Sequence, residues 1–168
     1  MPRSFEFSID SSATVEQIYE AFSDPDYWSA RMVAFGGVGK LESLGIGDDG
    51  AVEVLLNHEV SGSALPLIVA KVYPTRWHVV QTETWRQVAP NSLRGEVNFV
   101  THGAPGSGCG TALVTPMWCG SRLDCNAVVE FRVPLVGGKI ESLVGQFLRQ
   151  QFSMIQQFTA KWIARRAH

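Results

Sequence analysis

Apolar and polar residues alternate along much of the chain. Near the amino terminus Phe5, Phe7 and Ile9 are separated by glutamate and serine. A period of two is typical of a strand with one buried and one solvated face. The same period recurs at residues 52–60, 77–87, 93–101, 111–119 and 123–133. A short apolar run ahead of the turn sequence GDDG adds to this pattern, which predicts about six to seven strands joined by hairpins.

Turn signals indicate where these strands end. The sequence HGAPGSGCG, residues 102–110, predicts a flexible turn, and GSR, residues 120–122, predicts the turn between the last two strands. Pro116 cannot donate a hydrogen bond to a neighbouring strand, so we expect a bulge or a sheet edge there.

Helical spacing replaces the alternation near both ends. Residues 15–22 carry apolar side chains at helical spacing, and Ser12 or Thr14 can cap that helix. Pro25 suits the first turn of a second short helix. Residues 65–73 fit a short helix or a strand edge, and we favour the helix. The last segment predicts a helix of about six turns on an apolar stripe made of Ile140, Leu143, Val144, Phe147, Leu148, Phe152, Ile155, Phe158 and Trp162.

A pair of glycines, Gly137 and Gly138, precedes this long helix in the sequence VPLVGGKIES. A phosphate-binding loop needs G-x-x-x-x-G-K-[ST] or G-x-G-x-x-G, and neither spacing is present. Pro134 ends the strand, and the glycines permit a sharp change of direction, including positive φ. Glu141 and Ser142 suit the first turn of the helix. The stretch therefore predicts a hinge that aims the helix across the sheet.

The composition fits one globular domain. Among 168 residues, 45% are hydrophobic and 18% are charged, which is far from the signature of disorder. The net charge of −2 gives no general attraction for nucleic acid. The amino-terminal residues are polar and alternating, so we expect no signal peptide and a cytoplasmic location.

The cysteines do not predict a disulfide framework or a metal site. Cys109, Cys119 and Cys125 are an odd number. Cys119 and Cys125 could face each other across a hairpin, but two thiols alone do not make a zinc site. We expect no metal and no cofactor.

Two motifs at the ends of the chain carry a resemblance to a known family. The sequences FEFSIDSSATVEQIYEAFSDPDYW and RVPLVGGKIESLVGQFL resemble the START-like (SRPBCC, helix-grip) superfamily, and a branch of it common in actinobacteria. The resemblance implies an α+β helix-grip fold, in which a curved antiparallel sheet wraps around a long C-terminal helix, as one domain over residues 1–168. Members bind sterols, lipids, polyketides or plant hormones, and some are cyclases, dehydratases or hydrolases. The resemblance implies no catalytic residue, because the branch brings no assigned reaction.

Side chains on the inner faces of the strands and on the apolar stripe of the helix are the candidate ligand-binding residues. Strand parity selects Leu56, His58, Val97, Phe99, Met117, Val129 and Phe131, and the helix stripe adds Phe147, Phe152, Ile155 and Phe158. Four aromatic side chains are large enough to gate an entrance: Tyr27, Trp28, Trp85 and Trp118. A stripe of phenylalanine, leucine and isoleucine is also what an ordinary packed core contains. A bent sheet around one helix can nevertheless leave space that side chains do not fill, and ligand cavities are mostly apolar.

His58 is the weak catalytic candidate. It shares its parity with Leu56, so we expect it to point inward, where a histidine could act as a general base. The alternative is a core histidine bonded to a neighbouring carbonyl. Glu83 and Thr101 could supply polar anchors, and His102 is expected in a loop.

The sequence therefore favours a carrier or sensor of a small apolar ligand, lipid- or polyketide-like, held between sheet and helix. An enzyme of cyclase, dehydratase or hydrolase type, using His58 or Tyr27, is the alternative. A third interpretation is an interaction module with a filled interior. Lys161, Arg165 and Arg166 suit the end of a helix dipole and leave open a weak contact with an anionic membrane surface.

Overall fold

The computed structural model describes the chain except residues 1, 36–37, 62–66, 68–70, 72–75, 104–105, 134 and 168. The elements along the chain are β1 (Arg3–Ser11), α1 (Val15–Phe22), α2 (Pro25–Phe35), β2 (Val38–Ile46), β3 (Val52–Ser61), β4 (Arg76–Val88), β5 (Ser92–His102), β6 (Gly106–Met117), β7 (Gly120–Phe131) and α4 (Gly137–Arg166). The predicted helix at residues 65–73 lies outside the described residues, apart from Leu67 and Lys71.

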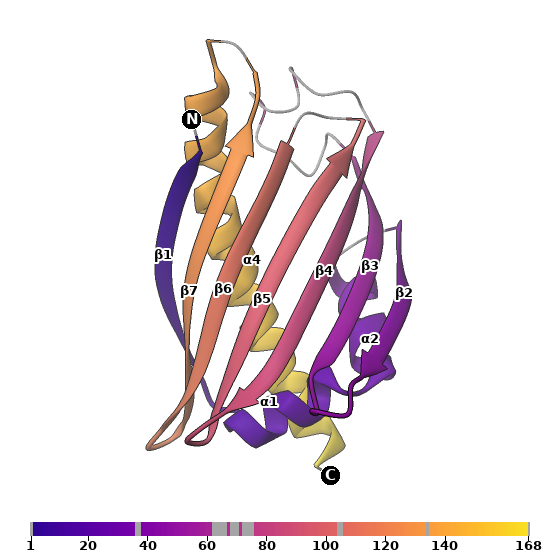
Figure 1. Ribbon diagram of the computed structural model, residues 1–168, viewed down its shortest axis with the longest axis vertical. Helices are drawn as coiled ribbons and strands as arrows, with labels where there is room; N and C mark the ends of the chain where they lie inside the picture. The colour runs from indigo at the N-terminus through magenta and orange to yellow at the C-terminus, as the bar shows by residue number, and fades with distance from the viewer. Residues whose placement is uncertain are drawn as a thin grey trace.

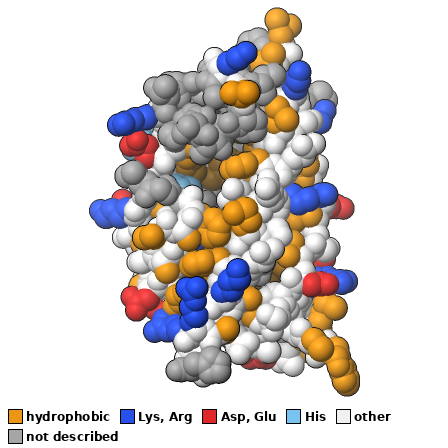
Figure 2. Space-filling model, turned by 180° about the vertical axis from the view of Figure 1, so that it is seen from behind, with side chains coloured by type: hydrophobic (Ala, Val, Ile, Leu, Met, Phe, Trp, Pro, Cys, Tyr) orange, Lys and Arg blue, Asp and Glu red, His pale blue; other side chains and the backbone are white. Residues whose placement is uncertain are grey.

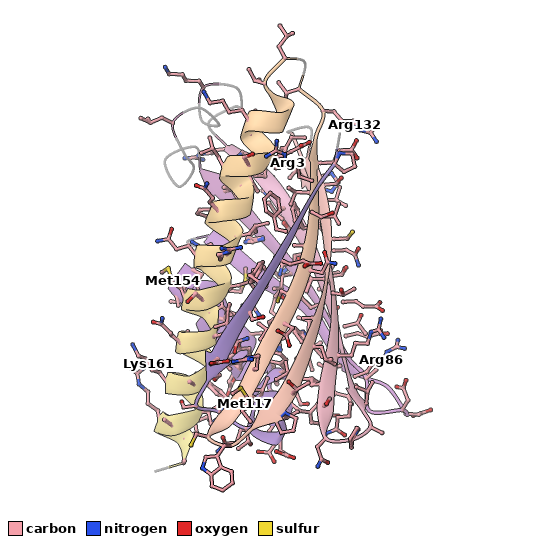
Figure 3. The ribbon with its side chains drawn as sticks, turned by 90° about the vertical axis from the view of Figure 1, so that its left-hand side faces the viewer. Arg3, Arg86, Met117, Arg132, Met154 and Lys161 are labelled. Carbon is pink, nitrogen blue, oxygen red and sulfur yellow. The ribbon has the colours of Figure 1, made fainter. Side chains whose placement is uncertain are left out.

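The strands form one sheet in the order β1-β7-β6-β5-β4-β3-β2, and each neighbouring pair is antiparallel. The first strand thus pairs with the last, directly ahead of α4. The 30-residue helix α4 crosses one face of this sheet, while α1 and α2 lie near its lower end (Figure 1). A side view shows that α4 lies on only one side of the sheet (Figure 3). The predicted α+β helix-grip architecture is confirmed.

Local signals position the short helices as expected. The Thr14 hydroxyl accepts a hydrogen bond from the backbone N–H of Gln17, and the Gln17 side chain accepts one from the Thr14 N–H, which completes a capping box. Pro25 is the first residue of α2, where its missing N–H leaves no helical hydrogen bond unmade.

Aromatic rings lie over glycines of neighbouring strands on the inner face of the sheet. The cross-strand pairs are Trp85 with Gly95, Phe99 with Gly108 and Phe131 with Gly106. A Cβ atom built on any of these glycines would come within 2.6 Å of the ring. Residues 106–110 are therefore strand, and the turn predicted there was wrong. The prediction failed because glycines usually indicate a turn. Here they leave room for a ring on a neighbouring strand, which no local pattern reveals.

The hairpin between β6 and β7 also differs from the prediction. Its turn is at Trp118 and Cys119, not at residues 120–122, which belong to β7. Pro116 pairs with Ser121 without a bulge. It lies beyond the last residue of β6 that pairs with β5, so its missing N–H interrupts no ladder on that side.

The connection from β7 to α4 is a sharp turn, but the glycines do not supply the positive φ. That conformation falls on Leu135, at φ 69°. Gly137 is instead needed for space, since a Cβ there would lie 2.7 Å from the carbonyl oxygen of Phe131. Glu141 is buried, and its Oε1 accepts a hydrogen bond of 3.3 Å from the Phe131 N–H. This contact holds the first turns of α4 against the end of β7.

Two groups of buried apolar side chains support the sheet. The larger group joins α1 and α2 to the lower ends of the strands. Helix α4 packs against it through Phe152, Phe158 and Trp162. The smaller group lies at the start of α4 and is formed by Val129, Phe131, Ile140 and Val144. Among the described residues, no helix combines the length and the hydropathy needed to cross a bilayer.

Close packing between α4 and β1 gives a test of this arrangement. A Cβ on Gly145 would lie 2.1 Å from the Phe5 ring, whereas one on Gly138 would meet nothing within 4 Å. We expect Gly145→Ala to lower the free energy of unfolding by about 1–3 kcal/mol, because overpacking outweighs the better helix propensity of alanine. Gly138→Ala should be neutral or stabilising. Urea unfolding measures both, and a Gly145→Ala variant as stable as the parent would contradict the packing.

Candidate functional site

Polar side chains gather between the inner face of the sheet and the helices. The buried members are Arg31, Glu83, Gln156 and Thr159. They come from α2, β4 and α4, and His58 joins them from the inner face of β3. Buried polar groups are uncommon unless they are hydrogen-bonded or serve a function. This set, with Tyr27 and Gln81, is called the interior polar cluster below.

An ion pair is the strongest feature of the cluster. Arg31 Nη2 lies 2.9 Å from Glu83 Oε1, with the two residues 7% and 2% exposed. The same oxygen accepts a 2.6 Å hydrogen bond from Gln81, and Glu83 Oε2 accepts one of 2.8 Å from the indole N–H of Trp85. Burial opposes the charge on Arg31, but its attraction to Glu83 raises the pKa of the guanidinium above its usual value. The two side chains therefore form a buried ion pair.

Tyr27 links α2 to α4. Its hydroxyl lies 2.7 Å from Thr159 Oγ1, which itself donates to the carbonyl of Ile155 at 2.8 Å. Thr159 has only one proton to give, so Tyr27 is the donor in their bond. Burial raises the pKa of Tyr27, so the hydroxyl keeps its proton. Tyr27 and Trp28 are both 0% exposed, and the prediction that they gate an entrance was wrong because each packs within the core.

Two further side chains of the cluster have room for additional hydrogen bonds. Among the described residues, His58 Nε2 and Gln156 Oε1 are buried and have no hydrogen-bond partner. Burial, and then the charge of Arg31, lower the pKa of His58, so the imidazole is neutral at pH 7. A buried polar atom without a partner costs about 1–3 kcal/mol. These atoms are therefore places where water or a ligand would bind.

Apolar side chains surround these polar groups. Leu56 and Val97 are buried on the inner face, and Trp85 and Phe131 lie there over their glycines. Phe99, Phe152 and Phe158 are half-buried and pack against the core clusters. Phe147 and Ile155 are also half-buried. Figure 2 shows hydrophobic side chains reaching the surface along the middle of the face seen from behind. The interior therefore offers apolar contact beside a few polar atoms.

Met117 and Trp118 do not belong to this interior. Met117 is 43% exposed and Trp118 is fully exposed. The buried side chains of β6 are Ala112 and Val114, so Met117 has the opposite parity, and Trp118 lies in the hairpin turn. The inner-face placement of Met117 was wrong because the hairpin turn was predicted at the wrong residues. Trp118, predicted to gate an entrance, lies instead in the turn itself.

Arg31, Gln156 and Thr159 were missed as site residues. A charged or polar residue in an amphipathic helix is usually assigned to the solvent side. The available signal was spacing, since Arg31 follows Tyr27 by four positions and Gln156 follows Phe152 by four. A polar residue at such a position lies within the apolar stripe. Thr101, another proposed anchor, instead bonds through its hydroxyl to both backbone groups of Gly106.

A groove of about 430 Å³ lies on the outer face of the sheet. It is lined mainly by solvated polar side chains, including Glu6, Arg94 and Asp124. The polar residues of this lining are exposed, unlike those of the interior polar cluster, so the groove is not the candidate site.

The thiols do not form a site. Cys119 is exposed in the hairpin turn, whereas Cys125 is buried and pairs with Ala112 of β6. The two therefore do not face each other. Burial, with the charges of Asp124 and Glu83, raises the pKa of the Cys125 thiol to about 12. Over the described part of the chain, histidine, cysteine and carboxylate side chains form no group of three that could hold a metal ion.

A curved antiparallel sheet, a long C-terminal helix across it and polar groups buried between them define a helix-grip protein. The chain belongs to the family described as "Protein of unknown function (DUF2505)", whose model matches residues 6–163. It is 35% identical over 170 residues to the "Uncharacterized protein Rv0481c" of Mycobacterium tuberculosis and to the "Uncharacterized protein Mb0491c" of Mycobacterium bovis, in each case over 97% of this chain and 98% of the relative.

Solved structures share the fold at low sequence identity. TTHA0849 from Thermus thermophilus has a TM-score of 0.59 at 14% identity, with all of both chains covered. Norcoclaurine synthase from Thalictrum flavum has a TM-score of 0.56 at 14% identity, over 98% of this chain and 87% of the synthase. Ara h 8.0201 has a TM-score of 0.56 at 9% identity, over 98% of this chain and 99% of that one. At these identities the likeness concerns the fold alone.

The lowered pKa of His58 predicts a pH dependence of stability. Below pH 6.5 the unfolded chain binds a proton on this histidine before the folded chain does, so stability falls as the pH falls through that range. We expect His58→Gln to lose less stability than the parent between pH 7.5 and 5.5, by at most about 1.4 kcal/mol per pH unit.

Urea unfolding at both pH values measures this difference. His78→Gln is the matched control, because His78 is exposed on β4, and it should behave like the parent. An unchanged pH dependence in His58→Gln would contradict a neutral, buried imidazole.

Proposed function

We propose that the protein is a carrier or sensor of a small, mostly apolar ligand that binds between the inner face of the sheet and α4. We further propose that the chain is a START-like protein and acts in the cytoplasm. The observation that carries the ligand proposal is that His58 Nε2 and Gln156 Oε1 are buried near apolar side chains and find no hydrogen-bond partner among the described residues.

The charges of the site favour a ligand with an uncharged polar end. Glu83 already neutralises Arg31 at 2.9 Å, and His58 is neutral at pH 7. A carboxylate placed beside this pair would lose its hydration and meet the charge of Glu83, which is unfavourable in a buried site. A hydroxyl group can donate to the amide oxygen of Gln156, and it can donate to or accept from His58 Nε2 in either neutral tautomer, without bringing a charge. A long-chain alcohol or a phenol fits this requirement better than a fatty acid.

An enzymatic role is the second candidate. A neutral histidine whose Nε2 is buried and unpartnered is in the protonation state that a general base requires. Norcoclaurine synthase, which shares the fold, is by its name an enzyme. Under this alternative a cyclase, dehydratase or hydrolase reaction would take place in the same interior, with His58 accepting the proton.

Ligand binding can be tested with the purified protein. Native mass spectrometry of protein from its own host should detect a retained apolar molecule of defined mass. In a displacement assay with the neutral fluorescent probe N-phenyl-1-naphthylamine at pH 8, decanol should compete at a concentration at least tenfold lower than decanoate, because only decanoate must bury a charge. Repeatedly empty protein that also fails to bind the probe would contradict the carrier and favour an interior filled by its own side chains.

Adjacent glutamines on α4 supply a matched pair of variants for the same assay. Gln156 is buried and Gln157 is exposed. Gln156→Leu should weaken decanol binding by about fivefold, since it removes one neutral hydrogen bond. Gln157→Leu should leave it unchanged, and equal effects of the two substitutions would show that Gln156 does not contact the ligand.

The enzymatic alternative has its own test. Parent, His58→Ala and the control His78→Ala are compared on a panel of small esters and aromatic polyketides. A general base predicts turnover that falls at least about 100-fold in His58→Ala and stays in His78→Ala. Equal turnover in all three, or none in any, would remove His58 as a catalytic residue.

A further inference from the structure

Leu135, in the turn between β7 and α4, has an unusual conformation and environment. Its φ is 69°, in the left-handed region that favours glycine and asparagine. Its side chain is nevertheless fully exposed, so no burial among the described residues offsets the unfavourable backbone. A large apolar side chain is thus held out in water at the tip of a turn.

The topology brings basic residues to the same end of the molecule. Neighbouring strands run in opposite directions, so the start of one strand lies beside the end of the next. One end of the sheet therefore holds the starts of β1, β4 and β6 and the ends of β5 and β7. Arg76 begins β4, Arg3 begins β1, and Arg132 follows β7. Lys139 is in the first turn of α4, and Lys71 lies in the connection from β3 to β4. Arg3 and Arg132 are seen at this upper end in Figure 3.

Positive charge is in excess at this upper end. Arg3, Lys71, Arg76, Arg132 and Lys139 are all exposed. Among the described residues, three carboxylates lie at the same end: Glu59, 3.5 Å from Arg76; Glu130, 3.5 Å from Arg132; and the buried Glu141 in the first turns of α4. The chain as a whole carries −2, so its negative charge is concentrated elsewhere. The opposite end, for example, carries Asp48 and Asp49 in the turn between β2 and β3.

We propose that this upper end docks on an anionic lipid bilayer, with Leu135 inserted among the headgroups. A single protruding apolar side chain ringed by long basic side chains suits a membrane surface, because lysine and arginine can reach phosphates while their stems cover apolar area. A protein partner would instead call for a broader apolar area than one leucine. The proposal does not depend on whether the interior holds a ligand.

The carboxyl-terminal basic residues are less suited to this role. Arg166 bonds to Asp24 and lies 4.5 Å from the centroid of the Trp162 ring. Arg166 is therefore paired more closely than Arg76 and Arg132, which lie 3.5 Å from their carboxylates. The acidic residues of α1 and α2 lie at the same end, and they would repel an anionic membrane surface.

Vesicle co-sedimentation tests the proposal. The protein should bind vesicles of phosphatidylcholine and phosphatidylglycerol at 7:3, and not phosphatidylcholine alone, and binding should fall between 50 and 300 mM NaCl. Leu135→Gly should weaken binding about tenfold by removing the inserted side chain. It should also fold at least as stably as the parent, because glycine tolerates the positive φ, so a loss of binding cannot come from unfolding.

Matched variants at the opposite end identify the docking surface. Trp118 is also fully exposed, in the hairpin turn, and Trp118→Gly should leave binding unchanged. Arg132→Gln should weaken binding about fivefold, and Arg86→Gln, toward the lower end in Figure 3, should not. Equal binding to both vesicle compositions, no binding to either, or a loss in Trp118→Gly but not in Leu135→Gly would overturn the proposal.

Discussion

The interior of this protein depends on the ion pair between Arg31 and Glu83. Two charges buried between a helix and a sheet are tolerated only because each satisfies the other and Glu83 also accepts hydrogen bonds from Gln81 and Trp85. Removing either partner would leave an isolated buried charge, a loss of about 3–5 kcal/mol. The pair also fixes the position of α2 against β4. The same contact therefore contributes both to the packing of α2 and to the polarity of the interior.

The electrostatics of the site follow from this pair. Because Glu83 neutralises Arg31, the cluster has no charge left for an ionised ligand, and the field of Arg31 helps to keep His58 neutral. Tyr27 and Thr159 are occupied with each other. Within the described part of the chain, the buried atoms of the cluster that have no hydrogen-bond partner are one imidazole nitrogen and one amide oxygen. Under the proposed ligand binding, such a site would discriminate by hydrogen bonding and apolar contact and not by charge.

The two ends of the sheet differ in charge for a topological reason. Antiparallel strands place the connections β3–β4, β5–β6 and β7–α4 at one end, and the tight hairpins and α1 at the other (Figure 1). Basic residues lie at the start or end of strands on the first side. A molecule that is acidic overall can thus present a basic surface in one direction, and a net charge computed for the whole chain conceals it.

The sequence by itself determined the strands, the short helices, the hinge and the long amphipathic helix, since these depend on residue periodicity and on local capping at Thr14 and Pro25. It also indicated the inner-face positions of Leu56 and His58 on one strand and of Val97 on another, because the alternation that assigns a side chain to a face is local to each strand. Only the tertiary structure decided the rest. Gly106 and Gly108 became strand because rings from β7 and β5 lie over them, and Met117 turned outward once the hairpin turn fell at Trp118. Arg31 is buried because Glu83, 52 positions away, faces it. Such pairings join residues that are distant in the chain, and no local pattern encodes them.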